Sequence, residues 1–254
     1  MKTADAIVSD PPTQYYDDPT FSYPAFWHGR EYEHEAELMA LRTLFGPRRF
    51  SVAVDIGGGF GRLAPLLKQY ARTLILVEPS EVQRSFARQH TSGEVSIYSG
   101  TASHTGLPDK YCDLVVMVRV LHHILEPKEA IAEIRRILKP GGLLALEFAN
   151  STHAKSRIKQ GVRLHRITAE PVRVNGTGDM RVPFVNHHPK AVYHALIQQG
   201  FVIEEVLSVS NMRSTLLKKL LPLSVLLWIE RAMQRPLGRA HFGPSVFVLA
   251  RRMP

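Results

Sequence analysis

The sequence has few of the features that mark secreted, disulfide-rich or metal-binding proteins. Its one cysteine, Cys112, cannot form an internal disulfide, and its place beside an apolar strand segment predicts a buried thiol. Residues 1–10 lack an apolar core behind a basic start, so no secretory signal is expected. No cluster of histidine, cysteine and acidic residues has metal-ligand spacing, and no metal site is predicted. These absences favour a cytoplasmic protein.

Acidic residues are scarce in the second part of the chain. Residues 1–150 hold 16 Lys+Arg against 18 Asp+Glu and residues 151–254 hold 16 against 5, so charges of −2 and +11 sum to the net +9. This basic excess would attract an anionic substrate, an anionic lipid surface or RNA, or would form a solvated face. The sequence lacks a basic motif interleaved with aromatic residues, so RNA is not the favoured partner.

The glycine-rich stretch VAVDIGGGFGR, at residues 52–62, is the most informative part of the sequence. Its β-branched residues favour a buried strand, and Gly57, Gly59 and Gly61 allow a tight turn and a close approach of a ligand to the backbone. Apolar residues at helical spacing follow from Leu63, which predicts a helix whose N-terminus points at the ligand. The alternative is a strand-to-helix turn without a ligand.

A second apolar strand segment, residues 73–77, ends in Glu78, about 20 residues beyond the loop. A carboxylate at this place binds both ribose hydroxyls of an adenosine, so the loop and the acid together predict a nucleotide cofactor. The dinucleotide fingerprint would require glycine where Arg62 stands, so NAD fits this loop imperfectly.

Asp55, two residues before the first glycine, and the loop after it resemble the first motif of the class I S-adenosylmethionine-dependent methyltransferases. Segment 100–108 resembles that family's adenine loop, and segment 112–123 resembles its fourth strand and the turn that passes the methyl group. Segment 137–148 resembles the helix end, turn and fifth strand that follow. The resemblance is closest to the small-molecule group called type 11, which includes quinone-biosynthesis enzymes.

The resemblance implies S-adenosylmethionine as the cofactor, with its methionine part on the glycine loop and its ribose on Glu78. Many relatives have an acid in the adenine loop, but this chain has Thr101, Ala102 and Ser103, so backbone groups or Ser103 would bind the adenine amine. Arg119 is expected near the methionine end, mainly through its backbone. The implied cofactor-binding residues are Arg30, Asp55, Gly57, Gly58, Gly59, Gly61, Glu78, Pro79, Thr101, Ala102 and Arg119.

Methyl transfer from a sulfonium requires little covalent chemistry of the protein, which mainly aligns the reactants and excludes water. A histidine base is useful if the acceptor is a hydroxyl or phenol. His122 and His123 follow the fourth strand and are the candidate bases or acceptor-positioning residues; the alternative is that they cap a turn or hydrogen-bond in the core. His187 and His188 are a second pair.

Residues 1–34 are expected to form a cap segment, since several tyrosines and Trp27 precede the core. In the resembled family such a segment often folds across the cofactor, and Arg30 would then pair with the cofactor carboxylate through a bidentate fork. The alternative is that the aromatic side chains pack a loose arm onto the core.

Alternating strand and helix patterns predict an α/β fold, a Rossmann-like doubly wound and mostly parallel sheet with helices on both faces. The resemblance implies seven strands, the last one antiparallel between strands five and six. We expect a single methyltransferase domain at 35–254, with a cofactor-binding core at 50–150, a substrate lid at 151–189 and an apolar helical insertion at 214–236. The expected elements include a helix at 127–138, which residues 139–142 end, a helix at 190–199, a strand at 201–209 and the last strand at 245–250.

The apolar stretch 216–229 is broken by two lysines and Pro222 and is shorter than the ~20 apolar residues that span a membrane. A packed helical pair, a membrane-surface element and a pocket for an apolar substrate tail remain open. The hypothesis is an S-adenosylmethionine-dependent methyltransferase acting on a small-molecule acceptor that is anionic or has an apolar tail. An RNA methyltransferase and a catalytically inactive cofactor-binding interaction module are the alternatives, and no oligomeric state is predicted.

Overall fold

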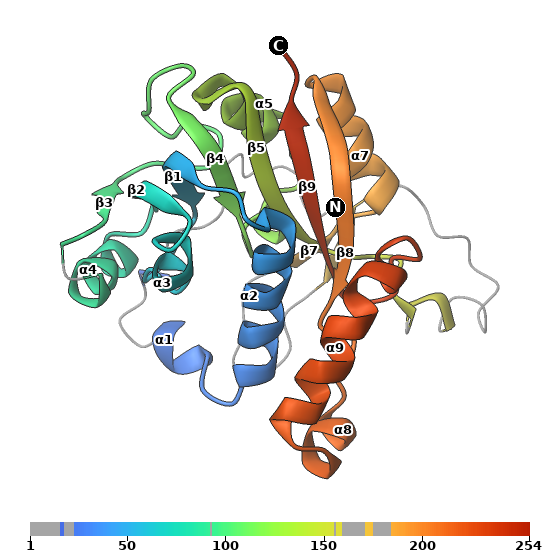
Figure 1. Ribbon diagram of the computed structural model, residues 1–254. Helices are drawn as coiled ribbons and strands as arrows, with labels where there is room; N and C mark the ends of the chain where they lie inside the picture. The colour runs from blue at the N-terminus through green and yellow to red at the C-terminus, as the bar shows by residue number, and fades with distance from the viewer. Residues whose placement is uncertain (1–15, 18–22, 92, 155, 159–170, 175–183) are drawn as a thin grey trace, which may run out of the picture.

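The main sheet of the protein has seven strands in the order β3-β2-β1-β4-β5-β9-β8 (Figure 1). The computed structural model describes residues 16–17, 23–91, 93–154, 156–158, 171–174 and 184–254. Strands β1 to β5 pair in parallel, and β9 pairs antiparallel with both β5 and β8. This confirms the predicted fold class and the antiparallel last strand. The strands are β1 Phe50–Ile56, β2 Ala71–Val77, β3 Ser96–Tyr98, β4 Cys112–Met117, β5 Leu138–Ala149, β8 Phe201–Val209 and β9 Ser245–Arg252.

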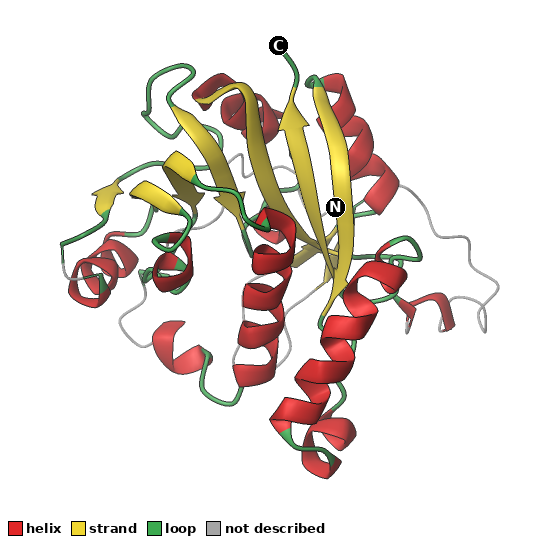
Figure 2. Cartoon of the chain, in the orientation of Figure 1, coloured by secondary structure: helices red, strands yellow, loops and turns green. Residues whose placement is uncertain are grey.

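Helices cover both faces of this sheet and make a three-layered molecule (Figure 2). Side chains alternate between the faces, as strand geometry requires. Val54 and Ile56 of β1 belong to the core under α5 and α7, whereas Ala53 belongs to the core under α2 and α3. The helices are α1 Tyr23–Phe26, α2 Glu31–Phe45, α3 Ala64–Leu67, α4 Glu81–His90, the 3-10 turn η2 Leu121–His123, α5 Lys128–Ile137, α7 Pro189–Gln198, α8 Thr215–Leu220 and α9 Leu223–Gly238.

Two local features differ from the sequence prediction. Residues 139–142 do not form a separate turn, because β5 begins at Leu138 directly after α5. The pairing of β5 with β4 shifts between Leu138 and Leu143, so these residues form a bulge, with Gly141 at φ +78°. The helix predicted from Leu63 is the single turn α3, because only residues 68–70 separate its end from β2.

The remaining sequence-predicted elements lie close to their expected bounds. α7 ends one residue before the expected Gln199, Gly200 follows at φ +72°, and β8 spans residues 201–209 as predicted. Cys112 is buried as expected; its thiol donates to the Ile137 carbonyl (3.4 Å), and burial raises its pKa to about 12.

The expected insertions differ in how much of them the structure describes. The apolar insertion is a helical pair, in which α9 packs on β8 and α2 with Leu226 buried. In the described ranges, no helix has the length and apolar character needed to cross a membrane. Most of the expected lid at 151–189 lies outside the described residues; its described part includes the antiparallel pair β6 Val172–Val174 and β7 Phe184–Asn186.

Candidate functional site

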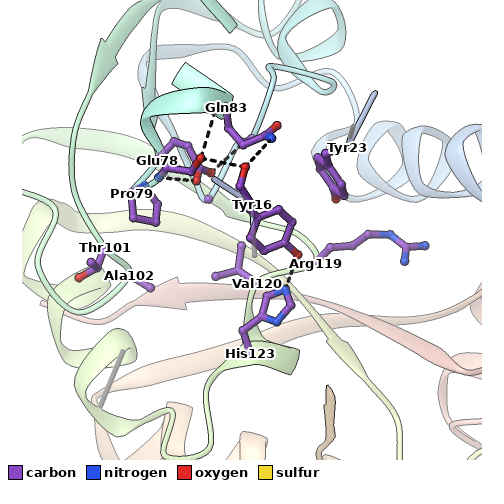
Figure 3. Close-up of a pocket in the computed structure, with 13 residues that line it drawn as sticks. Tyr16, Tyr23, Glu78, Pro79, Gln83, Thr101, Ala102, Arg119, Val120 and His123 are labelled. Atoms are coloured by element: carbon purple, nitrogen blue, oxygen red, sulfur yellow. Dashed lines mark hydrogen bonds between the residues drawn. The ribbon is translucent and has the colours of Figure 1, made fainter. Parts of the chain in front are cut away.

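A first cavity lies at the carboxyl ends of β1, β2 and β4, where open parallel sheets bind ligands (Figure 3). Its walls come from the glycine loop, the start of α4, the loop after β3, the segment after β4 and the amino-terminal segment. They include Glu78, Pro79, Thr101, Ala102, Arg119 and His123, all named from the sequence. The full set is Tyr16, Tyr23, Gly57, Gly59, Glu78, Pro79, Ser80, Gln83, Thr101, Ala102, Arg119, Val120 and His123.

The glycine loop presents bare backbone to this cavity. Gly57 and Gly59 have φ of +66° and +56°, which L side chains rarely adopt. A Cβ at Gly57 would lie 2.3 Å from a methyl group of Val120, and one at Gly59 would lie 3.3 Å from the Tyr23 ring. The loop therefore has room for a ligand against its peptide groups but not for its own side chains.

Glu78 supplies the carboxylate of the cavity. Its Oε2 accepts from the Gly59 amide (2.9 Å) and its Oε1 from the Ser80 amide (3.0 Å), so the acid is fixed to the glycine loop and to the start of α4. Burial raises the pKa of Glu78, and these two hydrogen bonds partly offset that rise. A fixed carboxylate beside a glycine loop fits the ribose of an adenosine cofactor.

Thr101 and Ala102 lie on the opposite side of the cavity from Arg119 (Figure 3). The Thr101 amide donates to the His104 carbonyl (2.9 Å), and the Thr101 hydroxyl is 3.2 Å from that of Ser103. The two hydroxyls thus hydrogen-bond to each other, and neither supplies the negative charge of the acid that many relatives have in this loop. Contact of this loop with adenine stays a prediction.

Tyr16 lies across the first cavity, from the Glu78 side to His123 (Figure 3). Its hydroxyl is 2.8 Å from His123 Nε2, and its carbonyl accepts from Gln83 Nε2 (3.4 Å). Next to it, Asp17 accepts from the Ser80 hydroxyl (2.5 Å) at the start of α4, where negative charge is favoured. The described part of the amino-terminal segment is thus attached to the cavity wall.

The two neighbouring histidines face different cavities. His123 lines the first cavity and His122 a second one, and their ring centroids are 4.0 Å apart. Burial lowers the pKa of His123 to about 4 and, together with His123 and Arg119, lowers that of His122 well below its usual value. Both side chains are therefore neutral at pH 7 and can accept a hydrogen bond, but they are weak bases.

The second cavity adjoins the first, because Tyr16, Tyr23 and Arg119 line both. It is the larger, with about 1170 Å³ of empty space against about 640 Å³ when the open mouths are included. Its other lining residues are Phe26, Arg30, His122, Glu147, Ala149, Asn150, His153, Phe184, Asn186, Ser210, Arg213, Pro244 and Ser245. Arg30, expected at the cofactor carboxylate, thus lies on the second cavity and not among the residues that line the first.

Arg119 is held by two buried acids. Its side chain donates to Glu37 (2.6 Å), which also pairs with Arg62 (2.6 Å), and its amide donates to Glu147 (2.8 Å). Burial alone would raise the pKa of Glu37, but the two arginines hold it below its usual value. Trp27 stacks beneath both guanidinium groups, 3.9 Å from Arg62 and 4.9 Å from Arg119.

Besides Arg30, three of the implied cofactor residues, Asp55, Gly58 and Gly61, do not line the first cavity. Asp55 is buried behind the loop, where a Cβ at Gly58 would lie 2.9 Å from its Oδ2. That oxygen has no hydrogen-bond partner among the described residues. Burial raises the pKa of Asp55 from 3.8 to about 7. Gly61 packs against Thr91, with a Cβ position 3.0 Å from its methyl group.

We expect Asp55 to make the protein less stable at neutral pH than at mildly acidic pH. A carboxyl whose pKa is higher in the folded chain takes up protons on folding, so the free energy of unfolding falls as pH rises from about 4 to about 7. Between about pH 5 and about pH 8 the wild type should lose about 3 kcal/mol more than Asp55→Asn. Urea unfolding at both pH values measures this difference, and equal losses in the two proteins would exclude Asp55 as the cause.

Sequence reasoning missed several residues of the two cavities. Glu147 carries a signal, an acid inside the apolar run of β5, and its Oε1 accepts from Ser245 (2.5 Å). No sequence pattern marks Arg213 or Gln83 as a cavity residue. The second histidine pair has structural contacts: His187 bonds the Leu121 carbonyl (3.0 Å), and His188 caps α7. No group of three potential metal-ligating side chains was found among the described residues.

Comparison with known proteins agrees with this geometry. A family model described as a methyltransferase domain matches residues 54–146. An uncharacterized methyltransferase of Geobacillus sp. (strain WCH70) is 34% identical over 93 residues, 36% of this chain and 44% of its own length. The ubiquinone/menaquinone biosynthesis C-methyltransferase UbiE of Stutzerimonas stutzeri is 30% identical over 122 residues, 43% of this chain and 46% of its own length. The chain thus spans less than half of either relative.

The fold also matches solved structures. An S-adenosylmethionine-dependent methyltransferase of Thermotoga maritima superposes with a TM-score of 0.60 at 20% identity, covering 94% of this chain and 97% of its own. At this identity the likeness concerns the fold. The family match at 54–146 begins within β1 and ends within β5, and it includes most residues of the first cavity. Residues 54–146 therefore match a methyltransferase domain and lie in the fold of S-adenosylmethionine-dependent methyltransferases, which implies S-adenosylmethionine as the cofactor.

Proposed function

We propose that this chain transfers the methyl group of S-adenosylmethionine to a small anionic acceptor that binds in the second cavity. The observation that carries the proposal is the shared wall of the two cavities, at Tyr16, Tyr23 and Arg119. A cofactor in the first cavity and an acceptor in the second would meet there. When bound, the cofactor supplies a methyl group on a positively charged sulfur, which a nucleophilic acceptor atom displaces.

The charge around the second cavity favours an anion. Arg30, Arg119 and Arg213 line it, and burial together with mutual repulsion lowers the pKa of Arg30 and of Arg213. Two nearby acids are already shared between cations: Glu37 binds Arg62 and Arg119, and Glu33 binds Lys218 (2.6 Å) and Arg213 (3.4 Å). Glu147, which lines the cavity, accepts from the Arg119 amide and the Ser245 hydroxyl, and burial raises its pKa.

Arg30 is the cation of this set that makes no ion pair with a described acid, although Glu33 acts on it electrostatically. Its guanidinium lies 3.8 Å from the Phe26 ring centroid, and no described carboxylate pairs with it. A carboxylate or phosphate on the acceptor would supply the missing partner and would fit a guanidinium fork bidentately.

The protein's part in the reaction is alignment and exclusion of water. Tyr16 and Tyr23 lie between the cavities, and Phe184 packs against both histidines, with ring centroids 4.9 Å from His122 and 5.8 Å from His123. Because the histidines are weak bases, they suit an acceptor that is already a good nucleophile, and they would orient it by hydrogen bonds. Their role stays a prediction.

A screen of acceptors with the arginine variants tests the proposal. Carboxylic acids and phosphates would be compared with their neutral esters, with methyl transfer followed by S-adenosylhomocysteine release. Arg30→Met and Arg213→Met should raise KM for an anionic acceptor about tenfold or more each, because a charged hydrogen bond is lost. Cofactor binding should be unchanged in both.

Arg235→Met is the matched control, because Arg235 lies on α9, pairs with Glu205 with 65% of its side chain exposed, and lines neither cavity. It should leave KM unchanged. Faster turnover of the neutral esters, or equal KM in all variants, would contradict an anionic acceptor. Cofactor binding without methyl release to any small molecule would contradict the proposed activity.

A further inference from the structure

Five large apolar side chains remain exposed on α8 and the first half of α9. They include Trp228, Leu220 and Leu216, with 72%, 67% and 64% of their surface accessible. α8 buries no residue, so its apolar side chains do not serve the core. We call this set the α8–α9 apolar surface: Leu216, Leu220, Leu223, Val225 and Trp228.

These side chains are not the packing face of α9. The buried residues of α9, Leu226, Glu230, Gln234 and Gly238, recur every four residues and form the stripe that faces the protein. Trp228 lies between Leu226 and Glu230 in sequence and is exposed. The first half of α9 is therefore apolar on its outer side as well, which folding does not require.

The segment that carries the apolar surface contributes positive charge and no acid of its own, and Glu33 of α2 pairs with two of its cations, Arg213 and Lys218. Residues 211–229 contain Arg213, Lys218 and Lys219 and no acid. The next acid, Glu230, is buried and accepts from Tyr32 (2.6 Å). Lys219 lies three residues after Leu216 on α8 and Arg231 three residues after Trp228 on α9, so each exposed cation shares a helix face with an exposed apolar side chain. Neither cation has an ion-pair partner among the described residues.

The surface lies next to the second cavity. Ser210 and Arg213, which line that cavity, belong to the loop that leads from β8 into α8. α8 and the first turns of α9 extend beyond the carboxyl end of β8 (Figure 1).

We propose that the α8–α9 apolar surface docks on a bilayer that contains anionic lipids. Exposed leucines and a tryptophan next to unpaired Lys and Arg are the composition of elements that lie in a membrane interface. A second copy of the chain fits less well, because a two-fold interface would bring the same cations of both copies together. The proposal does not depend on the identity of the acceptor.

Vesicle binding tests the proposal with the full chain. Flotation with phosphatidylcholine vesicles, with and without about 30% phosphatidylglycerol, should show binding only to the anionic vesicles and weaker binding in about 0.5 M NaCl. Trp228→Gln and Leu220→Gln should each weaken binding about tenfold, because apolar contact area is lost. The double variant Lys219→Glu with Arg231→Glu should remove the preference for anionic over neutral vesicles.

Ile197→Gln is the matched control, because Ile197 is an exposed apolar residue (61%) on a different helix, α7. It should bind vesicles like the wild type, and unchanged cofactor affinity would show that all variants are folded. Absent binding to anionic vesicles, or equal weakening in Ile197→Gln, would overturn the proposal. A dimer that Trp228→Gln dissociates in sedimentation velocity would overturn it in favour of a second copy.

Discussion

Replacing Glu78 with alanine is expected to weaken S-adenosylmethionine binding at least about hundredfold, because the variant lacks the carboxylate to which we expect both ribose hydroxyls to donate. The Glu78 carboxylate also accepts from the Gly59 and Ser80 amides and so holds the glycine loop in place. The alanine variant lacks both of these hydrogen bonds. Calorimetric titration of the cofactor measures the loss. Glu78→Gln retains one acceptor oxygen and should fall between the wild type and alanine.

Glu81→Ala is the control for this experiment, because Glu81 is also an acid at the start of α4 but is exposed and pairs with Arg84 and Arg88. It should bind the cofactor like the wild type. Unchanged affinity in Glu78→Ala, with the fold intact by circular dichroism, would show that Glu78 does not bind the cofactor. Its role would then be the structural one of connecting β2 to the glycine loop.

Glu37→Gln is expected to lower the free energy of unfolding by about 3–5 kcal/mol, because removing one partner leaves the buried charges of Arg62 and Arg119 uncompensated. Because the pKa of Glu37 is lower in the folded chain, its contribution is present above the unfolded value near 4.5 and is lost as pH falls through the folded value. Urea unfolding at neutral pH measures the change.

Glu81→Gln serves as the surface comparison and should leave the urea midpoint unchanged, since exposed ion pairs contribute little. An equally small change in Glu37→Gln would mean that Arg62 and Arg119 find other partners or water. The double variant Glu37→Gln with Arg62→Met separates these cases, since it should recover part of the loss if an unpaired guanidinium is the cause.

The sequence predicted those parts of the fold that local pattern determines. Gly200 ends α7 and β8 follows at its predicted bounds, because the positive φ of that glycine and the strand pattern are local signals. The position of β9 between β5 and β8 came from family resemblance alone, since long-range strand order leaves no local pattern. The bulge at the start of β5 was missed because a Pro-Gly-Gly run is typical of a turn as well.

The first cavity was predictable where its residues follow strands, as Gly57, Glu78 and His123 do. The second cavity was not, because Arg30, Glu147 and Arg213 meet only through tertiary packing. The placing of Tyr16 across the first cavity likewise depends on contacts with Gln83 and His123, far from it in sequence.

The most direct test of the central claim is calorimetric titration of S-adenosylmethionine into the wild-type chain, with NADH as the competing ligand. The geometry of the glycine loop and Glu78 predicts saturable binding of S-adenosylmethionine, no binding of NADH, and loss of binding in Gly59→Arg, whose side chain would enter the space beside Tyr23. Absence of binding, or binding of NADH instead, would contradict the assignment of the first cavity to this cofactor.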